Sequence, residues 1–306
     1  MKVRVLGSAA GGGVPQWNCG CDNCREARRG TGLVRPRTQE SVAISADGAA
    51  WFLLNVSPEI RAQIESFAPL TPREPRHSPI VGLVLTNGDL DHCLGLLSLR
   101  ESHPLTVYAT ESVRAGFTAG NVLYRTLERF PGQVTWRALA VDHAAAPARE
   151  QPLGDSGLTI TAVATPGNPP LHLKSLRQPS VEDNVGLVVR DTRTGKRLAY
   201  FSGVAGPSAV LERALAEADV LFFDGTFWSS DELIKLGLGT RRAEEMSHWP
   251  LGGPEGSAAF LARQRGRKIL IHVNNTNPIL REGSAERRAL DAAGIEVADD
   301  GLELAL

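Results

Sequence analysis

Apolar runs of strand length alternate with amphipathic helical runs along most of this 306-residue chain. The alternation constrains the fold most strongly, because strands separated by helices pack in layers around sheets and not as separate all-helical and all-strand halves. We therefore predict an α/β protein. The Pro- and Gly-rich stretches are short, as loops between elements are, so we expect residues 1–306 to form a single domain.

The pattern also places individual elements. Asp47-Gly48 is a hairpin turn between two strands, and Ser57 followed by Pro58 predicts a helix that starts with a serine N-cap. Strands are predicted at residues 3–6, 41–45, 51–54, 80–85, 105–109, 134–138, 158–163, 185–189, 198–201, 220–223 and 269–273, and later helices at 209–216, 256–264 and 284–293.

Charge and hydropathy exclude some classes of partner. Lys and Arg number 33, Asp and Glu number 34, and the net charge is -1, whereas nucleic acid recognition needs a basic field. No window approaches the ~20 apolar residues of a spanning helix, and the first residues form an alternating strand and not a secretory signal. We expect no nucleic acid partner, no membrane insertion and a cytoplasmic location in which the thiols stay reduced.

Three of the four cysteines, Cys19, Cys21 and Cys24, fall within six residues. Three thiolates suit one tetrahedral Zn(II) whose fourth ligand comes from elsewhere, and because such a site has no open position we predict a structural role. Three solvated cysteines are the alternative. An iron–sulfur cluster usually needs a fourth cysteine, and the remaining Cys93 is predicted to be a small buried side chain.

A run of metal-ligand types follows the apolar strand at 80–85. The stretch Thr86-Asn87-Gly88-Asp89-Leu90-Asp91-His92 gathers two carboxylates and an imidazole where a helix begins. Its spacing resembles the His-x-His-x-Asp-His signature of the metallo-β-lactamase superfamily. In that alignment Asn87 and Asp89 replace the two leading histidines, while Asp91 and His92 match.

The resemblance implies one intact set of ligands. His272, after the strand residues 269–271, matches a late histidine of the superfamily and joins Asp91 and His92. Two imidazoles and one carboxylate form the set found in non-haem Fe(II) enzymes that activate dioxygen, but Zn(II) could use the same ligands to activate water. Structural readings remain open as well, since Asp89 and Asp91 could cap the helix and both histidines could be hydrogen-bonded core residues.

The resemblance also implies that the other metal position has lost its ligands. Asn168 follows Thr165-Pro166-Gly167 where the superfamily usually has a histidine, and Val204 follows Ser202-Gly203 where it has a bridging aspartate. The first metal position would retain Asn87, Asp89 and Asn168, which is a poor set for zinc because two of the three are neutral amides, and no carboxylate would bridge two ions. We therefore expect no two-metal hydrolytic site.

One loop histidine also matches the superfamily. His248, in Met246-Ser247-His248-Trp249-Pro250, corresponds to a histidine that relatives use near the reacting group. The resemblance implies that His248 shuttles a proton or contacts the substrate near Trp249, and a surface imidazole is the alternative. Asp89, if it does not cap the helix, is a second candidate for the same work.

Several longer motifs together resemble the PqqB family, coenzyme PQQ synthesis protein B. The resemblance implies an αββα four-layer sandwich of the metallo-β-lactamase type and a place in the synthesis of pyrroloquinoline quinone (PQQ) from a ribosomal peptide. The activity it implies is iron-dependent, O2-using hydroxylation of the tyrosine ring in a cross-linked Glu-Tyr precursor. A carrier of PQQ or its precursor and a zinc-dependent hydrolase are the alternatives. The motifs are residues 17–24, 86–92, 223–228, 246–250 and 272–278.

The resemblance further implies partners and a fourth zinc ligand. The partner would be a tyrosine-derived peptide or the Glu-Tyr precursor, and a homodimer is compatible with it. Relatives with the Cys-x-Cys-x-x-Cys insert take their fourth zinc ligand from a histidine three residues after the His272 position. Asn275 occupies that place here, so we expect Asn275 at the cysteine zinc and His272 at the active site.

Overall fold

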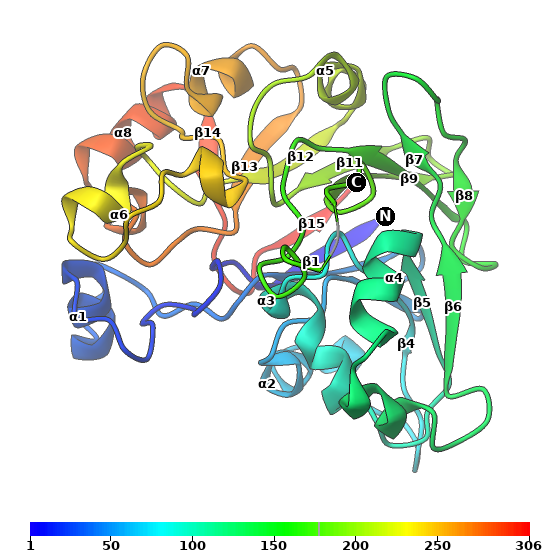
Figure 1. Ribbon diagram of the computed structural model, residues 1–306. Coiled ribbons are helices and arrows are strands. Elements are labelled where there is room, and N and C mark those ends of the chain that lie inside the picture. The colour runs from blue at the N-terminus through cyan, green and yellow to red at the C-terminus, as the bar shows by residue number, and fades with distance from the viewer. Residues whose placement is uncertain (177) are drawn as a thin grey trace.

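The computed structural model describes residues 1–176 and 178–306. Its strands form two mixed sheets that face each other, with helices on both outer sides (Figure 1). This is the predicted α/β architecture in four αββα layers. In spatial order the first sheet contains β15 (Glu303–Ala305), β1 (Lys2–Gly7), β2 (Ser41–Ser45), β3 (Trp51–Leu54), β4 (Ile80–Val84), β5 (Leu105–Ala109) and β6 (Val134–Ala138).

The second sheet is built mainly from the later part of the chain. In spatial order it contains β14 (Ile295–Val297), β13 (Arg267–Ile271), β12 (Val220–Asp224), β11 (Arg197–Phe201), β10 (Val185–Asp191), β9 (Leu158–Ala164) and β7 (Val141–Asp142), and β8 (Gln151–Pro152) also pairs with β9. The strands β11 to β14 are parallel to one another, as are β3 to β6 in the first sheet.

Helices cover the outer face of each sheet. Helices α2 and α4 pack on the first sheet, and α5, α7 and α8 pack on the second (Figure 1). The α-helices are α1 (Asp22–Arg29), α2 (Ile60–Glu65), α3 (Leu90–Cys93), α4 (Glu111–Thr118), α5 (Ala209–Ala216), α6 (Glu232–Lys235), α7 (Ser257–Ala262) and α8 (Ala285–Ala292). Short 3-10 turns are η1 (Ala68–Leu70), η2 (Leu94–Ser98), η3 (Val122–Leu127), η4 (Glu244–Met246) and η5 (Pro278–Leu280).

The strands are apolar on both faces because each face is covered. Along β12, Val220 and Phe222 point into the core between the sheets, while Leu221 and Phe223 pack against the helices. Successive strand side chains point to opposite faces, so a strand buried on both sides reads as a continuous apolar run. This is why the sequence placed β2, β3 and β5 at their observed bounds.

Several predicted bounds differ from the observed ones by one to three residues, and two of the differences have a clear physical cause. Helix α2 begins at Ile60 and not at Ser57, because the carbonyl of Ser57 accepts the Ile60 amide in a preceding turn, 3.0 Å away. The Ser57 hydroxyl is buried and has no hydrogen-bond partner in the described part of the chain. Strand β13 ends at Ile271, because His272 adopts a positive φ of 58°, which is incompatible with an extended strand.

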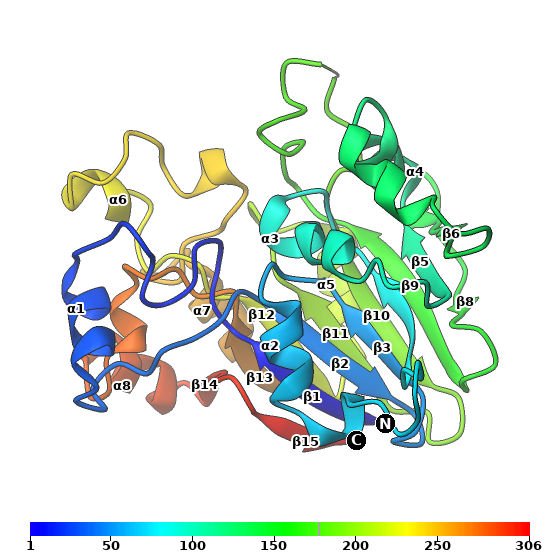
Figure 2. The ribbon, with the colours of Figure 1, turned by 90° about the horizontal axis from the view of Figure 1, so that it is seen from below.

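Three strand ends meet at one edge of the sandwich. The loop that follows β4 leads into α3, β12 ends at Asp224, and His272 follows β13. Figure 2 shows α3 above the sheets, between α6 on one side and α4 on the other. Carboxyl ends of parallel strands lie at the same edge of a sheet, so residues far apart in the sequence are brought together there.

None of the helices among the described residues has both the length and the hydrophobicity that crossing a bilayer requires.

The core between the sheets should dominate stability. Leu187 on β10 is fully buried there, and we expect Leu187→Ala to lower the free energy of unfolding by about 2–5 kcal/mol through lost burial and a residual cavity. Leu123→Ala, at a side chain that is 60% exposed, is the matched control and should change it by less than about 0.5 kcal/mol. Urea unfolding followed by circular dichroism measures both, and equal effects would contradict this core assignment.

Candidate active site and metal centres

Asp91, His92 and His272 come together at the edge where the strands end. Asp91 and His92 lie on α3, and His272 follows β13. The Asp91 Oδ2 atom is 3.2 Å from His272 Nε2 and 3.6 Å from His92 Nε2. The two rings lie with their centroids 5.0 Å apart and nearly perpendicular, at 85°. The structure thus places the three predicted metal ligands around one point.

Buried polar groups orient His92. Its Nδ1 atom is 3.1 Å from Thr86 Oγ1 and 3.1 Å from Asn55 Nδ2. The two N–H groups of Asn55 Nδ2 can be donated to Glu40 Oε2 and the Tyr200 hydroxyl, 3.0 and 3.2 Å away. The Thr86 hydroxyl can donate to Asn55 Oδ1 and accept a hydrogen bond from His92 Nδ1–H. That assignment leaves a lone pair on Nε2. The Nε2 atom is buried and has no hydrogen-bond partner among the described residues.

A threonine orients His272 in the same way. His272 Nδ1 is 2.8 Å from Thr226 Oγ1, and its Nε2 faces Asp91. His272 therefore points into the active site. If it pointed toward the cysteines, Asp91 and His92 would lack their third ligand. Its positive φ is uncommon for a residue with a Cβ and directs the ring away from the line of β13.

The donor set fits a single ion. Two ligand atoms about 2.1 Å from one ion, at an angle of about 90–110°, are separated by about 3.0–3.4 Å. The separations of Asp91 Oδ2 from the two Nε2 atoms are close to that range. A buried ring nitrogen with no partner is costly unless something binds it, and a metal ion would satisfy His92 Nε2.

Burial and charge set the protonation of these groups. Burial lowers the pKa of His92 to about 4, which favours the neutral ring that a metal needs. Burial would also lower the pKa of His272, but the hydrogen bond and charge of Asp91 outweigh it and raise that pKa to about 9. Burial would raise the pKa of Asp91, and the neighbouring imidazoles overcome this and hold it well below its usual range. Without an ion, His272 and Asp91 therefore act as an ion pair.

A second buried carboxylate holds His248. Asp224 Oδ2 lies 2.7 Å from His248 Nδ1, and the His248 ring stacks on His272 with centroids 5.2 Å apart. Asp224 also accepts the Val204 amide, at 2.9 Å, and the amide and hydroxyl of Thr226, at 3.0 and 2.6 Å. Asp224, His248 and His272 also lie close enough together to hold an ion. The Asp224 oxygens already accept four hydrogen bonds from the protein, so we assign Asp224 to orienting His248.

Trp249 does not share the position of His248. Its Nε1 donates to the Glu255 carbonyl, 3.0 Å away, and its ring packs against Phe260 with centroids 5.3 Å apart. Trp249 is absent from the pocket that contains the three ligands, whereas Phe227 lines that pocket. Trp249 therefore lies outside the pocket that His248 lines, because its contacts with Glu255 and Phe260 hold it elsewhere, and this argues against the predicted substrate contact near Trp249.

Asp89 is turned toward the pocket and does not cap α3. It occupies the N-cap position, but its side chain makes no capping hydrogen bond. Its carboxylate lines a pocket of about 300 Å³ together with Asp91 and His248. Burial and the neighbouring Asp91 raise the pKa of Asp89 to about 6. Asp89 thus stays available as the second candidate for proton transfer.

Amides occupy the place of the lost metal position. Asn87 donates to Asn184 Oδ1, 3.3 Å away, and Asn184 donates to the Gly203 carbonyl, 2.9 Å away. Asn168 lines the same pocket and bonds through its backbone amide to Ser247 Oγ, 2.9 Å away. Among the described residues, the other group of three possible ligands at this edge is Asp224, His248 and His272, and it shares His272 with the first group. The described residues therefore form no separate second metal position there.

Glu40 was missed by the sequence reasoning. Its side chain is fully buried, its Oε2 accepts from Asn55 Nδ2 at 3.0 Å and lies 3.7 Å from His92 Nε2. Burial raises its pKa to about 8. A glutamate next to a strand at 41–45 reads as an exposed residue, and only the fold shows that it lies beneath the metal ligands.

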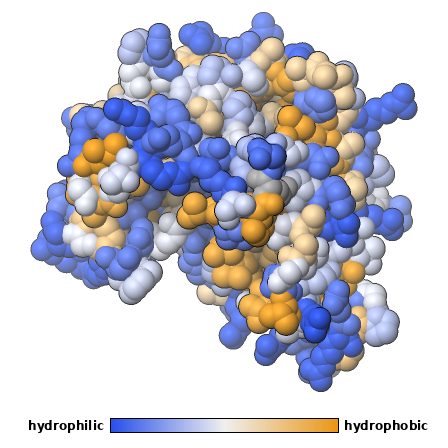
Figure 3. All heavy atoms as spheres, viewed as in Figure 1, coloured by the Kyte–Doolittle hydropathy of each residue, from blue (hydrophilic) through white to orange (hydrophobic). Residues whose placement is uncertain are grey.

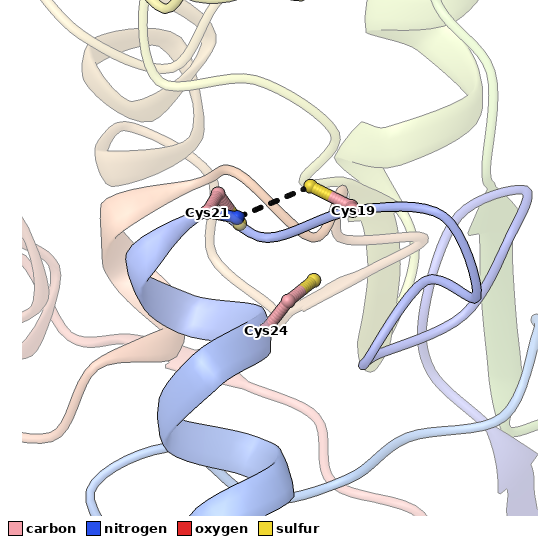
Figure 4. A group of neighbouring side chains, drawn as sticks. All are labelled: Cys19, Cys21 and Cys24. Carbon is pink, nitrogen blue, oxygen red and sulfur yellow. Dashed lines mark hydrogen bonds between the residues drawn. The ribbon is translucent and has the colours of Figure 1, made fainter.

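The three clustered cysteines converge as predicted, and Figure 4 shows the side chains of Cys19, Cys21 and Cys24. The amide nitrogen of Asn275 lies 3.2, 3.6 and 3.3 Å from their respective sulfurs. A half-turn about the last side-chain bond would exchange that nitrogen for Oδ1. Asn275 therefore occupies the expected fourth position. Cys93 is buried elsewhere, with its Sγ 3.5 Å from the Gly88 carbonyl.

Comparisons with known proteins agree with this geometry. A Beta-lactamase superfamily domain model matches residues 50–273. Coenzyme PQQ synthesis protein B of Azotobacter vinelandii is 45% identical over 307 residues, covering 100% of both chains. The chain belongs to the PqqB family. A Zn(2+)-bound PqqB crystal structure from Methylobacterium extorquens is 44% identical, covers 100% of both chains and superimposes with a TM-score of 0.90. The family and the αββα metallo-β-lactamase fold predicted from the sequence are thus confirmed.

More distant structures share only the fold. A diphosphatase from the PhnP family is 21% identical, with a TM-score of 0.66 over 100% of this chain and 97% of that one. This likeness shows the fold alone.

The cysteine cluster should retain zinc. We expect Cys24→Ser to lower the zinc content of purified protein by about one ion per chain, because it removes one of three thiolate ligands. Cys93→Ser is the matched control and should leave the zinc content unchanged. Mass spectrometry of the metal content measures both. Since an amide oxygen is a weaker ligand than a thiolate, Asn275→Ala should speed zinc loss to a chelator less than Cys24→Ser does, and unchanged zinc in Cys24→Ser would contradict the site.

Proposed function

We propose that this PqqB-family chain acts in PQQ biosynthesis by hydroxylating the tyrosine ring of a Glu-Tyr precursor with Fe(II) and O2. The relatives that this chain matches along their full length are named as PQQ synthesis proteins. The observation that carries the reaction is the single intact set of Asp91, His92 and His272 beside a position occupied by amides. Two imidazoles and one carboxylate, with open positions, are the set used by non-haem Fe(II) oxygenases.

In this proposal the three residues hold the ion and leave room beside it. Fe(II), when bound, supplies the activation of O2. The pocket of about 300 Å³ that the ligands line is large enough for an aromatic ring. In the overall change an aromatic C–H becomes C–OH. One oxygen atom of O2 enters the ring, and the other leaves as water with two protons and with two electrons from an external reductant.

His248 is proposed to handle the phenol proton. Its Nδ1–H donates to Asp224 Oδ2, 2.7 Å away, which leaves a lone pair on Nε2. His248 lines the pocket, so Nε2 can accept the proton of a phenol bound there. A phenolate ring is richer in electrons than a phenol ring and reacts more readily with an oxidant. Asp89 is the alternative proton acceptor on the other side of the pocket.

Packing fixes the plane of the imidazole. His248 stacks on His272 at 27° and meets Phe227 edge-on, with ring centroids 5.8 Å apart. Phe227 is 5% exposed and lines the same pocket. An aromatic substrate beside Phe227 could adopt an edge-to-face or offset arrangement. The apolar wall thus suits the ring, while His248 receives its hydroxyl group.

A zinc-dependent hydrolase is the second candidate. The related Methylobacterium extorquens PqqB structure is Zn(2+)-bound, and zinc on Asp91, His92 and His272 could activate a water. Metal content and oxygen consumption separate the two candidates, because only the oxygenase consumes O2. A carrier of PQQ or its precursor would need neither reaction.

We expect His272→Ala and Asp91→Ala to abolish Fe(II) binding at the active site and O2 consumption with the Glu-Tyr precursor, because each leaves only two protein ligands. Anaerobic Fe(II) titration and an oxygen electrode measure these effects. His103→Ala, at a histidine outside the pocket, is the control and should retain both.

Wild-type protein that binds Fe(II) and precursor but consumes no O2 in the presence of a reductant would overturn the oxygenase. Cells in which both variants still support full PQQ production would favour the carrier.

His248→Gln should separate proton transfer from metal binding. We expect it to lower kcat for hydroxylation by about 100-fold or more, the usual contribution of a general base, while the Fe(II) dissociation constant changes by less than about threefold. His103→Gln is the matched control. Single-turnover product formation, measured by mass spectrometry on iron-loaded protein, gives the rate. An unchanged rate in His248→Gln would show that His248 does not accept the phenol proton and would leave Asp89 as the candidate.

A further inference from the structure

We infer that Lys174 and Arg241, at the mouth of the active-site pocket, bind two carboxylates of the substrate and set its orientation. The inference deepens the proposed function and rests on it for the position of the ring. Both residues line the pocket that contains Asp91, His92 and His272. They define a ligand with an aromatic group at one end and two acidic groups at the other.

The two cations come from different loops. Lys174 lies in the connection between β9 and β10, and Arg241 lies between α6 and η4. In Figure 1 the green connection and the yellow loop near α6 stand on opposite sides of the site. In the same view, Figure 3 shows hydrophilic atoms between an apolar patch over α6 and a second one at the centre of the face. Two cations on opposite sides can bind two separate carboxylates.

Charge inside the pocket favours one orientation. The carboxylates of Asp89 and Asp91 together balance the two positive charges of a bound Fe(II), so the inner end of the pocket offers an anionic group no net positive charge. Lys174 and Arg241 are the pocket-lining lysine and arginine of the described chain, and they belong to the flanking loops. An acidic ligand therefore gains most by leaving its carboxylates at the mouth and inserting its uncharged ring.

Neither cation has an acidic partner among the described residues. Other surface arginines of the described chain are paired with acidic residues, as Arg190 is with Glu150 and Arg267 is with Glu296. Lys174 is exposed and has no ion pair in the described chain. Arg241 is half-buried, and its Nη2 donates to the Glu245 carbonyl. That bond fixes the guanidinium without neutralising it, so the remaining N–H groups can bind a carboxylate.

The adjacent arginine provides an internal comparison. Arg242 follows Arg241 directly, is exposed and does not line the pocket. On α6, Lys235 pairs with Asp231 at 2.9 Å and also lies outside the pocket. If positive charge near this edge strengthened binding in a general way, replacing Arg242 or Lys235 would weaken ligand binding as well. If the carboxylates bind at a specific site, only replacing Lys174 or Arg241 would weaken it.

The test is a binding titration on anaerobic, iron-loaded protein with three probes. The dipeptide Glu-Tyr carries two carboxylates, Glu-Tyr amide carries one, and Gln-Tyr amide carries none. Isothermal titration calorimetry gives each dissociation constant without turnover. For the wild type we expect affinity to fall about five- to tenfold with each carboxylate removed, as for partly exposed charge-assisted hydrogen bonds.

The variants assign that preference to residues. Lys174→Gln should weaken Glu-Tyr binding about fivefold, and Arg241→Gln about tenfold because its guanidinium is less exposed. The double variant should bind all three probes with similar affinity. Lys235→Gln and Arg242→Gln should stay within about twofold of the wild type.

Equal wild-type affinity for the three probes, or an unchanged preference in the double variant, would overturn the inference. A clear preference without O2 consumption would overturn the proposed reaction and leave the carboxylate site intact.

Discussion

The site depends on one buried carboxylate at the end of β12. Asp224 accepts four hydrogen bonds, from the Val204 amide, the Thr226 amide and hydroxyl, and His248 Nδ1. Through Thr226 it also orients His272, because the hydroxyl that donates to Asp224 can accept from His272 Nδ1. A fully buried carboxylate is stable only when its oxygens are satisfied. The same four bonds therefore tie the end of β11, the loop after β12 and the loop of His248 into one arrangement.

A single short segment links the two candidate metal centres. His272 faces Asp91, and three residues later Asn275 faces the cysteines. Asn23 on α1 holds the backbone of this segment through the carbonyls of Asn275 and Asn277, 3.1 and 2.8 Å away. Zinc in the cysteine cluster would thus stiffen the backbone that presents His272. We infer that the cysteine loop stabilises the active site through this segment, although its own ligands contact no substrate.

Much of the fold follows from local pattern, and most of the support for the site does not. The continuous apolar runs predicted the buried strands, and the motif ending in Asp91 and His92 predicted a ligand set because those residues are neighbours on α3. Glu40 and Asn55 meet the ligands only through long-range contacts, so nothing in their local sequence separates them from ordinary strand-end residues. Asp224 lies in the motif at 223–228, but only its long-range contact with His248 shows what it does. The start of α2 was misplaced for a related reason, since tertiary contacts decide such boundaries.

The amides that replace the lost metal ligands change what the pocket can hold. Asn87, Asn168 and Asn184 are weak ligands for zinc but capable hydrogen-bond donors and acceptors, and they line the wall beside the remaining set. Where a second ion would lie next to Asp89, the pocket instead keeps open volume, and Asp89 and Asp91 together balance the charge of a single divalent ion. The lysine and arginine that line the described pocket, Lys174 and Arg241, then offer an anionic group more than the metal ligands do. The loss of one metal position thus creates space for an uncharged ring, and this favours one-metal chemistry on an aromatic group over two-metal hydrolysis.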